Sequence, residues 1–430
     1  MRHEIKLIKH LADRHLQGGA MYYAVFVMLV LSMLSVLMIN YLDLTFREDL
    51  IFYKNADLVD DCRSALVRVA CEPELLSRGD VFQLDLFDNG EAIVEVSGSR
   101  WGFMRKVSVS ALWKHLRKSK VVLMAEREGE RSALWMPERN RYLSLVGRSQ
   151  IKGDVHLSEL GLRRANIEGR YFEGVNLHDG KMYISPSQMP LIEDDLFNWV
   201  YRYSSSNDLK SDSLIAFESL SQPSGIKQSF ASKSLVVKSR ESVSLVKGVF
   251  HDNVVLVSSD TMVVWPSVDL CNAVLIADVI VFKAGFKGQL QAFATKELIV
   301  EENCSFLYPS FIGAMSAFPE VKVTIGEGLH LNGGIFCFSK HAEEENTVLS
   351  IGKTDGVVGK VYTNGDLRMN GRIIGGLYCN RFVYQTSRAF YENFMLDVVI
   401  DESALPKNYA SFCVGQELFK FKTVLECQDY

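Results

Sequence analysis

The chain has 430 residues, which is enough for two or three domains. Its 47 basic and 52 acidic residues give a net charge of −5, and no run of Lys and Arg interleaves with aromatic residues, which excludes a nucleic-acid partner. Hydrophobic residues make up 48% of the chain, and Val, Ile and Phe are abundant in its second half, which indicates strands. We therefore expect a mainly β protein.

Residues 1–19 form a short basic leader that ends in Gly18-Gly19. More basic residues precede the following apolar run than follow it, so the positive-inside rule predicts a cytoplasmic N-terminus and a bulk that lies outside the inner membrane, in the periplasm. We interpret three histidines in the leader as part of a solvated face and not as a metal site. The basic residues are Arg2, Lys6, Lys9 and Arg14 before the run and Arg47 and Lys54 after it, and the histidines are His3, His10 and His15.

Residues 20–73 are predicted to form a transmembrane helix that continues as an amphipathic stem. Ala20 to Ile39 is apolar, and twenty residues at ~1.5 Å each match the ~30 Å hydrocarbon core of a bilayer. Neither Gly nor Pro interrupts the chain before Pro73. The alternatives are a span, a linker and a separate helix, or a cleaved signal peptide, whose apolar region usually has only ~7–15 residues. The apolar face of the stem is formed by Leu44, Ile51, Leu58, Cys62, Leu66 and Val69.

This beginning resembles that of the type IV pilins and pseudopilins, in which a basic leader ends in Gly and precedes an apolar helix. The resemblance rests on Gly19 followed by Ala20-Met21-Tyr22-Tyr23-Ala24-Val25. It implies leader processing between Gly19 and Ala20, and partners among other envelope, pilus or secretion-system subunits. One position departs from the family, because Ala24 stands where a Glu is usual. Minor subunits at the tip of such assemblies can lack this Glu, so a minor pseudopilin-like protein is expected.

Residues 74–141 are interpreted as a small β-rich module. Residues 81–87 and 92–96 alternate between apolar and polar around a turn signal at 88–90, which predicts a hairpin. Residues 111–118 are predicted to form a short helix before the strand at 121–124. We interpret Trp101 and Trp135 as packing aromatics and not as a ligand site.

Residues 142–400 are predicted to form an irregular parallel β-helix. Met262-Val263-Val264, Ile280-Val281-Phe282 and Leu298-Ile299-Val300 follow one another at eighteen residues, the length of one three-strand coil. Val321-Lys322-Val323 is expected next, and the pair Leu349-Ser350-Ile351 and Leu367-Arg368-Met369 repeats the interval. Glycines at 359, 365 and 371 fit corners that need positive φ. A β-sandwich with strands at this interval is the alternative.

The coil length and the glycine-punctuated strands resemble those of the bactofilins, a resemblance that implies architecture only. Within this region we expect a helix over 192–203 and a Ser-rich insertion at about 204–234. Residues 401–430 are expected to form a C-terminal cap or tail.

The eight cysteines predict no metal site, because no CxxC or CxxH spacing occurs. Cys62 and Cys71 lie nine residues apart on one helix and cannot form a disulfide within it. Cys413 and Cys427 are the pair that a disulfide test should address.

Three acidic or histidine pairs are the candidates for catalysis in a β-helix groove: His251-Asp252, Asp154 with His156, and Glu301-Glu302. Each lies in a turn-like position and none recurs on successive coils, so we predict no catalytic residue, no cofactor and no enzyme. Two function classes remain. The first is a non-enzymatic cell-envelope component that is pseudopilin-like or an anchored scaffold. The alternative is a membrane-tethered protein that binds or cleaves carbohydrate.

Overall fold

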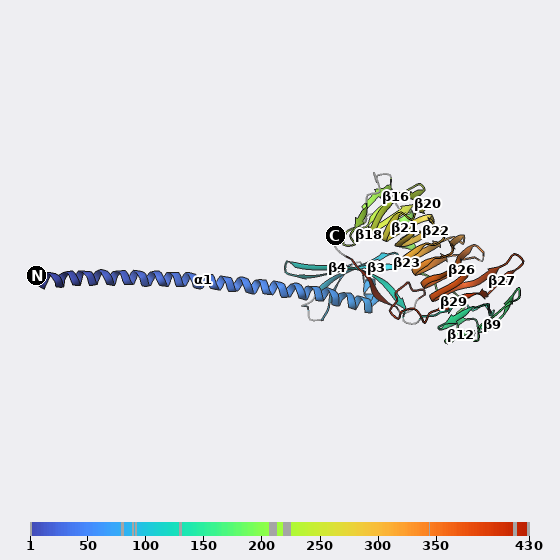
Figure 1. The fold of residues 1–430 in the computed structure, drawn as a ribbon, viewed down its shortest axis with the longest axis horizontal. Helices are drawn as coiled ribbons and strands as arrows, with labels where there is room; N and C mark the ends of the chain where they lie inside the picture. The colour runs from blue at the N-terminus through green and yellow to red at the C-terminus, as the bar shows by residue number, and fades with distance from the viewer. Residues whose placement is uncertain are drawn as a thin grey trace.

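The computed structural model describes residues 2–430 except 79–80, 88–89, 91–92, 129–130, 206–212, 218–224, 344, 416–418 and 428–430. A single long helix projects from a body made of a small antiparallel sheet and a parallel β-solenoid (Figure 1). Strands account for 54% of the chain, and the solenoid has about 11 turns. The predicted fold class, a mainly β protein with a long N-terminal helix and a β-helix, is confirmed.

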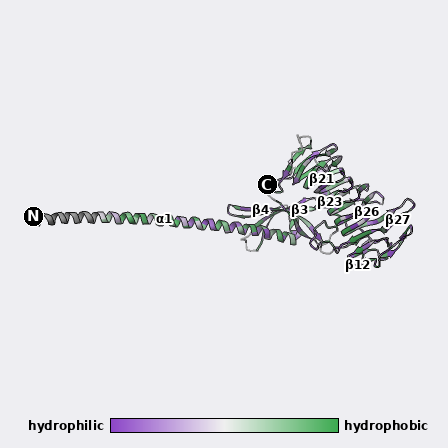
Figure 2. Cartoon of the chain, viewed as in Figure 1, coloured by the Kyte–Doolittle hydropathy of each residue, from purple (hydrophilic) through white to green (hydrophobic). Residues whose placement is uncertain are grey.

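Helix α1 runs without interruption from Arg2 to Cys71, 70 residues that span about 105 Å. The leader is therefore helical too, and the alternative of a span, a linker and a separate helix is wrong. Within Gly19–Cys71 the most apolar window has a mean hydropathy of 2.4, and none of it is buried against the rest of the protein. Figure 2 shows this apolar stretch followed by a mixed one.

The last four turns of α1 pack on the small sheet. Leu58, Cys62, Leu66 and Val69 are buried there, as the amphipathic pattern predicts. Leu44 and Ile51, assigned to the same face, are instead 56% and 40% exposed. The sheet does not extend far enough along the helix to cover them, so only the C-terminal part of this face is packed.

The small sheet is antiparallel in the order β1-β2-β3-β4-β30. It follows a 3-10 turn η1 (Pro73–Arg78), and its strands are β1 (Val81–Asp85), β2 (Ile93–Trp101), β3 (Met104–Trp113), β4 (Leu116–Glu128) and β30 (Phe419–Glu426). The helix predicted over 111–118 is wrong: Trp113 pairs with Leu116 across a tight turn, and Lys114 has a φ of 53°. This short run of apolar and basic residues fits both the helical period of 3.6 residues and the strand period of two. Burial of Ala111 under α1 favours the strand.

The C-terminal segment does not cover an end of the solenoid with its strand. β30 is instead the fifth strand of the small sheet, where it pairs antiparallel with β4. Phe421 is buried under α1 in that sheet. The alternation of apolar and polar residues after Phe419 suits a strand with one face on a core. The described residues 401–415 and 419–427 therefore form a strap that returns to the small sheet and not a cap.

The solenoid starts earlier than predicted, at β5 (Leu134–Trp135), and ends at β29 (Val398–Asp401). Its coils pair in parallel, and three further strands form a parallel sheet of their own in the order β28-β6-β9. Two antiparallel pairs, β26 with β27 and β10 with β11, lie beside these coils. The remaining bounds are β6 (Leu143–Val146), β7 (Gln150–Lys152), β8 (Val155–Leu157), β9 (Leu162–Arg164), β10 (Asn166–Ile167), β11 (Arg170–Tyr171), β12 (His178–Asp179), β13 (Met182–Ile184), β14 (Ser213–Ala216), β15 (Ile226–Gln228), β16 (Leu235–Ser239), β17 (Val243–Leu245), β18 (Gly248–Asp252), β19 (Val254–Ser258), β20 (Thr261–Val264), β21 (Val268–Phe282), β22 (Lys287–Val300), β23 (Ser305–Ser316), β24 (Val321–Ile325), β25 (His330–Ser339), β26 (Thr347–Gln385), β27 (Phe390–Glu392) and β28 (Phe394–Leu396).

The predicted eighteen-residue spacing is confirmed over residues 262–300, where the sequence repeat is most regular. Met262 pairs with Ile280, and Ile280 pairs with Leu298. The next step differs from the prediction, because Leu298 pairs with Val323 and not with Val321. The intervening loop therefore adds seven residues and not five to the coil.

The coils are not stacked in chain order. Residues 134–184 stack on the C-terminal end of the main stack, where β5 pairs with β26 and β7 pairs with β29. Helix α2 (Asp194–Ser205) then connects this end to the opposite end, where β14 and β15 begin the main stack. The helix predicted at 192–203 is confirmed. The Ser-rich insertion is wrong in part, since β14 and β15 lie inside it and belong to the coils; 206–212 and 218–224 lie outside the described residues.

Serine hydroxyls repeat at one corner of the coils. The side chains of Ser239, Ser258, Ser316 and Ser339 each accept the backbone N–H two residues later, at 3.1–3.2 Å. Such local hydrogen bonds stabilise a turn at the end of a strand. At another corner Gly333, Gly359 and Gly375 lie above one another with positive φ, and a Cβ on Gly359 would fall 1.9 Å from the Gly333 carbonyl oxygen.

One outer face of the solenoid is apolar and covered. Phe293, Phe336 and Tyr362 are fully buried on this face. The cover is formed by α2, by the tip of the β2–β3 hairpin, and by the strap from Ala410 to Val414. Trp101 and Trp135 are both buried in this layer, which confirms that they are packing aromatics.

Candidate functional site

Side chains from each of the three candidate pairs contact residues of neighbouring coils. The two members of a pair do not contact each other. His251 Nε2 lies 2.9 Å from Asp269 Oδ2, one coil away. Asp252, with a φ of 67°, accepts a hydrogen bond from Asn272 Nδ2 at 2.9 Å. Glu301 accepts from Lys283 Nζ at 2.6 Å. These contacts connect successive coils.

Asp154 and His156 likewise contact different residues and not each other. Asp154 accepts the backbone N–H of Lys181 at 2.8 Å. His156 Nδ1 lies 2.9 Å from Ser132 Oγ, and its ring stacks on Tyr183 with centroids 5.0 Å apart. Glu302 is exposed in the turn after β22. The geometry of two carboxylates across one substrate, which glycoside hydrolysis requires, is not formed by these candidates.

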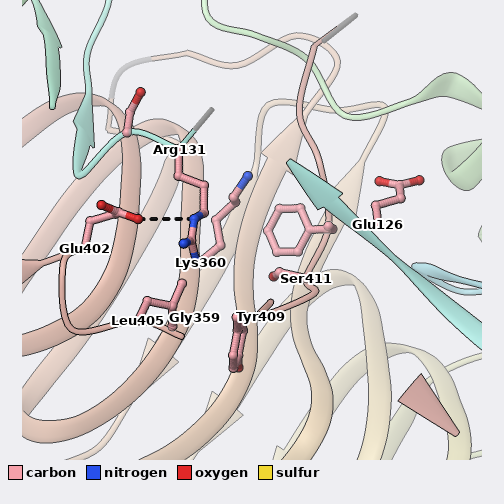
Figure 3. A pocket seen from close by; sticks show the side chains of 11 residues that line it. Glu126, Arg131, Gly359, Lys360, Glu402, Leu405, Tyr409 and Ser411 are labelled. Atoms are coloured by element: carbon pink, nitrogen blue, oxygen red, sulfur yellow. Dashed lines mark ion pairs between the residues drawn. The ribbon is translucent and has the colours of Figure 1, made fainter. Parts of the chain in front are cut away.

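Charged and polar side chains from three parts of the chain line a small pocket at the junction of module, solenoid and strap (Figure 3). Glu126 comes from the end of β4, Lys360 from β26, and Tyr409 and Ser411 from the strap. Arg131 forms an ion pair with Glu402 at 3.2 Å on one side of the pocket. No sequence motif marks these residues, although charges in the apolar runs around Glu126 and Lys360 are a usable signal.

Glu126 holds the strap to the module through two hydrogen bonds. Its carboxylate accepts the N–H of Cys413 at 2.9 Å, and its backbone carbonyl accepts the N–H of Ser411 at 2.8 Å. Burial, together with the nearby Glu193 carboxylate, raises the pKa of Glu126 to about 7. The Cys413 N–H and two arginines, Arg100 and Arg105, oppose this shift.

Lys360 is buried beside the same strap. Its Nζ lies 4.7 Å from the ring centroid of Tyr378 and 5.6 Å from that of Phe412. Cation–π contacts of this kind stabilise an ammonium group that has lost part of its hydration. The pocket therefore works as an attachment point that joins three chain segments.

The cysteines and histidines assemble no metal centre in the part of the chain that the structure describes. The leader histidines belong to a segment whose side chains lie outside that description. The structure forms no disulfide among the eight cysteines, so the pair proposed for a disulfide test, Cys413 and Cys427, is not bridged. Burial raises the pKa of the Cys337 thiol to about 12, which keeps it protonated.

Gly19 and Ala20, the predicted processing site, lie within the continuous helix α1. A Cβ on Gly19 would meet nothing within 4 Å. Processing between these residues stays a prediction.

No protein-family model matches the chain, and neither a curated protein nor a solved structure matches it significantly.

Proposed function

We propose that the chain is a non-enzymatic cell-envelope component, a minor pseudopilin-like subunit or anchored scaffold that holds a β-solenoid outside the inner membrane. The observation that carries the proposal is the uncovered apolar part of α1. Its large side chains range from 37% exposed at Val30 to 82% at Tyr22. Each would cost roughly 1.5–3 kcal/mol in water, and a bilayer removes that cost.

The charges around this segment support a cytoplasmic N-terminus and a periplasmic body, as the positive-inside rule predicts. Beyond the span, residues 40–57 continue α1 for about 27 Å before the helix reaches the small sheet. The stem therefore holds the solenoid clear of the lipid headgroups.

The packing of α1 supports a pseudopilin-like subunit. The C-terminal end of the helix packs on an antiparallel sheet while the rest projects from the body (Figure 1). On the projecting stem, Leu42, Phe46, Leu50 and Tyr53 recur at four, four and three residues, which is one helical face, and all are exposed. Partners for this face would be the stem helices of other envelope, pilus or secretion-system subunits.

Membrane anchorage is tested by fractionation of the full chain and by protease treatment of spheroplasts. We expect the chain in the membrane fraction, with its body cleaved by external protease. Leu29→Arg combined with Leu34→Arg should release it, because an arginine at the centre of a span costs about 2.5–3.5 kcal/mol. The matched control is Val67→Arg, an exposed position of the same helix beyond the span. A protected body would contradict the topology.

Assembly is tested by a photo-crosslinking amino acid at Phe46 in cells. We expect adducts with other envelope proteins from Phe46 and none from Glu48, which is exposed on the opposite side of the stem. Equal labelling from both positions would contradict a specific stem partner. Release of reducing ends from an envelope glycan by the purified chain would contradict the non-enzymatic proposal.

A further inference from the structure

The far end of the solenoid is formed by β12 and β13, which lie at the end of the stack near the β9 and β12 labels in Figure 1. β12 pairs with β7, and β13 pairs with β8. Each of these pairings uses one edge of the terminal strand. Among the described residues, no strand register covers the other edge.

The interior column of the solenoid is uncovered at this end. Leu377 pairs with Leu134, Leu134 with Val155, and Val155 with Met182. The first three side chains are fully buried, whereas Met182 is 48% exposed. Ile184, which pairs with the buried Leu157, is 66% exposed. These two side chains occupy core positions with a coil beneath them and none above.

A column of rings on the outer side of the same coils ends in the same way. Trp135 stacks on Tyr378 with an interplanar angle of 8°, and His156 stacks on Tyr183 with an angle of 20°. Trp135 pairs with His156, which joins the two stacks into one column. Tyr183 is its last member and is 42% exposed.

At alternate residues of β13, the backbone N–H and C=O groups are directed toward the open end of the solenoid. The Lys181 carbonyl accepts the Val155 N–H at 2.8 Å, and the Ser185 N–H donates to the Leu157 carbonyl at 3.0 Å. In a parallel ladder successive residues direct their N–H and C=O groups to opposite sides, so the residues that alternate with Lys181 and Ser185 direct theirs away from β8. The amides of Met182 and Ile184 therefore face the open end, as in an edge strand ready for another strand.

We propose that this open end binds the same end of a second copy of the chain, so that two solenoids join end to end in a symmetric dimer. Coil-to-coil contact without chain continuity is already part of this fold, because Val399 on β29 pairs with Gln150 on β7. Asp179 and Lys181 flank the turn at Gly180, so the end carries no excess charge that would oppose self-contact. An isologous contact of this kind closes at two copies.

The arrangement of stem and solenoid suits such a dimer. The coils from β16 to β12 are stacked across the direction of α1 (Figure 1). A two-fold axis parallel to the stem therefore joins the two solenoids and leaves both stems directed toward one bilayer. The direction of this axis rests on the proposed membrane anchor, whereas the contact itself does not.

The test is the protein mass of the full chain in detergent micelles, measured by light scattering over a dilution series. We expect a dimer for the wild type. Ile184→Asp should raise the dissociation constant by on the order of tenfold or more, because a charge would be buried in the contact. The matched control is Val246→Asp, which changes a side chain that is 55% exposed in the turn between β17 and β18, and it should stay dimeric.

Hydrogen exchange provides a second readout on the same samples. The Met182 and Ile184 amides should gain protection as the wild-type concentration rises, and they should not do so in Ile184→Asp. A wild type that is monomeric throughout, with or without protected amides, or a dimer unchanged by Ile184→Asp, would overturn the proposal. Dimerisation through Ile184 in a chain that fails to fractionate with membranes would contradict the proposed function alone.

Discussion

At the residue scale, two polar side chains join the parts of the body. Glu126 binds the strap, and Gln291 binds the β2–β3 hairpin to the outer face of the solenoid. Gln291 Nε2 donates to the Trp101 carbonyl at 2.8 Å, and its Oε1 accepts the Phe103 N–H at 2.8 Å. Between these two residues Gly102 has a φ of 62°, and a Cβ there would fall 2.1 Å from Gln291 Oε1. The hairpin tip is therefore shaped to accept this amide.

Glu126 makes stability depend on pH. The pKa of Glu126 is about 7 in the folded chain and ordinarily 4.5, so between these values the unfolded chain loses a proton that the folded chain keeps. The free energy of unfolding should fall as pH rises through this window, by about 1.4 kcal/mol per unit. Glu126→Gln keeps an acceptor for the Cys413 N–H and should remove this slope.

The measurement is thermal unfolding of the full chain in detergent from pH 4.5 to 8. Glu126→Gln should melt higher than wild type at pH 8, and the two should converge toward pH 4.5. Glu302→Gln, at an exposed glutamate, serves as the control and should follow the wild type. Parallel curves of melting temperature against pH for Glu126→Gln and wild type would contradict the assignment of the pH dependence to Glu126.

Gln291→Leu should destabilise the body by about 2–4 kcal/mol, because the buried Phe103 N–H and Trp101 C=O lose their partner. Denaturant unfolding followed by tryptophan fluorescence reports it directly, since Trp101 is buried at this contact. Gln150→Leu, at an exposed position of β7, is the control and should change stability little. An equal effect of both variants would show that the amide is not needed.

At the scale of elements, the length of the small sheet decides how much of α1 is packed. Leu58→Asp should cost several kcal/mol, because an unpaired carboxylate would lie against the sheet. Leu44→Asp is the matched control: it lies two heptads earlier on the same predicted face but is exposed. Melting of the two variants in detergent checks this, and a loss of stability in Leu44→Asp equal to that in Leu58→Asp would mean that the packed part of α1 extends further toward its N-terminus.

Sequence patterns predicted the elements that repeat a local period and missed those that depend on distant partners. The apolar helix at 20–39, the coils at 262–300 and helix α2 each carry a local signal, either a continuous apolar run or a periodic pattern. The turn at Lys114, the strand β30 and the exposure of Leu44 depend on which segment lies beside them. Of the junction pocket, only the charges of Glu126 and Lys360 within apolar runs could have been noticed, and their convergence required the strap.

At the scale of the whole molecule, the order of the coils makes the body one interlocked unit. The first solenoid segment, 134–184, is stacked on the last, and the strap returns from the solenoid to the module. Both contacts cross the connection between α2 and β14. Stability is shared between neighbouring coils in a solenoid, so these contacts should hold the two halves together without a covalent link.

A chain split between Asn207 and Asp208 should therefore reassemble. Co-expressed fragments 1–207 and 208–430 are expected to co-purify as a one-to-one complex, because β4 pairs with β30 and β7 pairs with β29 across the split. Adding Ile400→Asp to the second fragment places a charge in the column between Ile373 and Ile151, which are fully buried, and should abolish the complex. Val246→Asp in the same fragment is the control and should leave it intact. If the unmodified fragments separate in native buffer, coil-to-coil contact is too weak to replace the chain, and the same weakness would apply to the open end at β13.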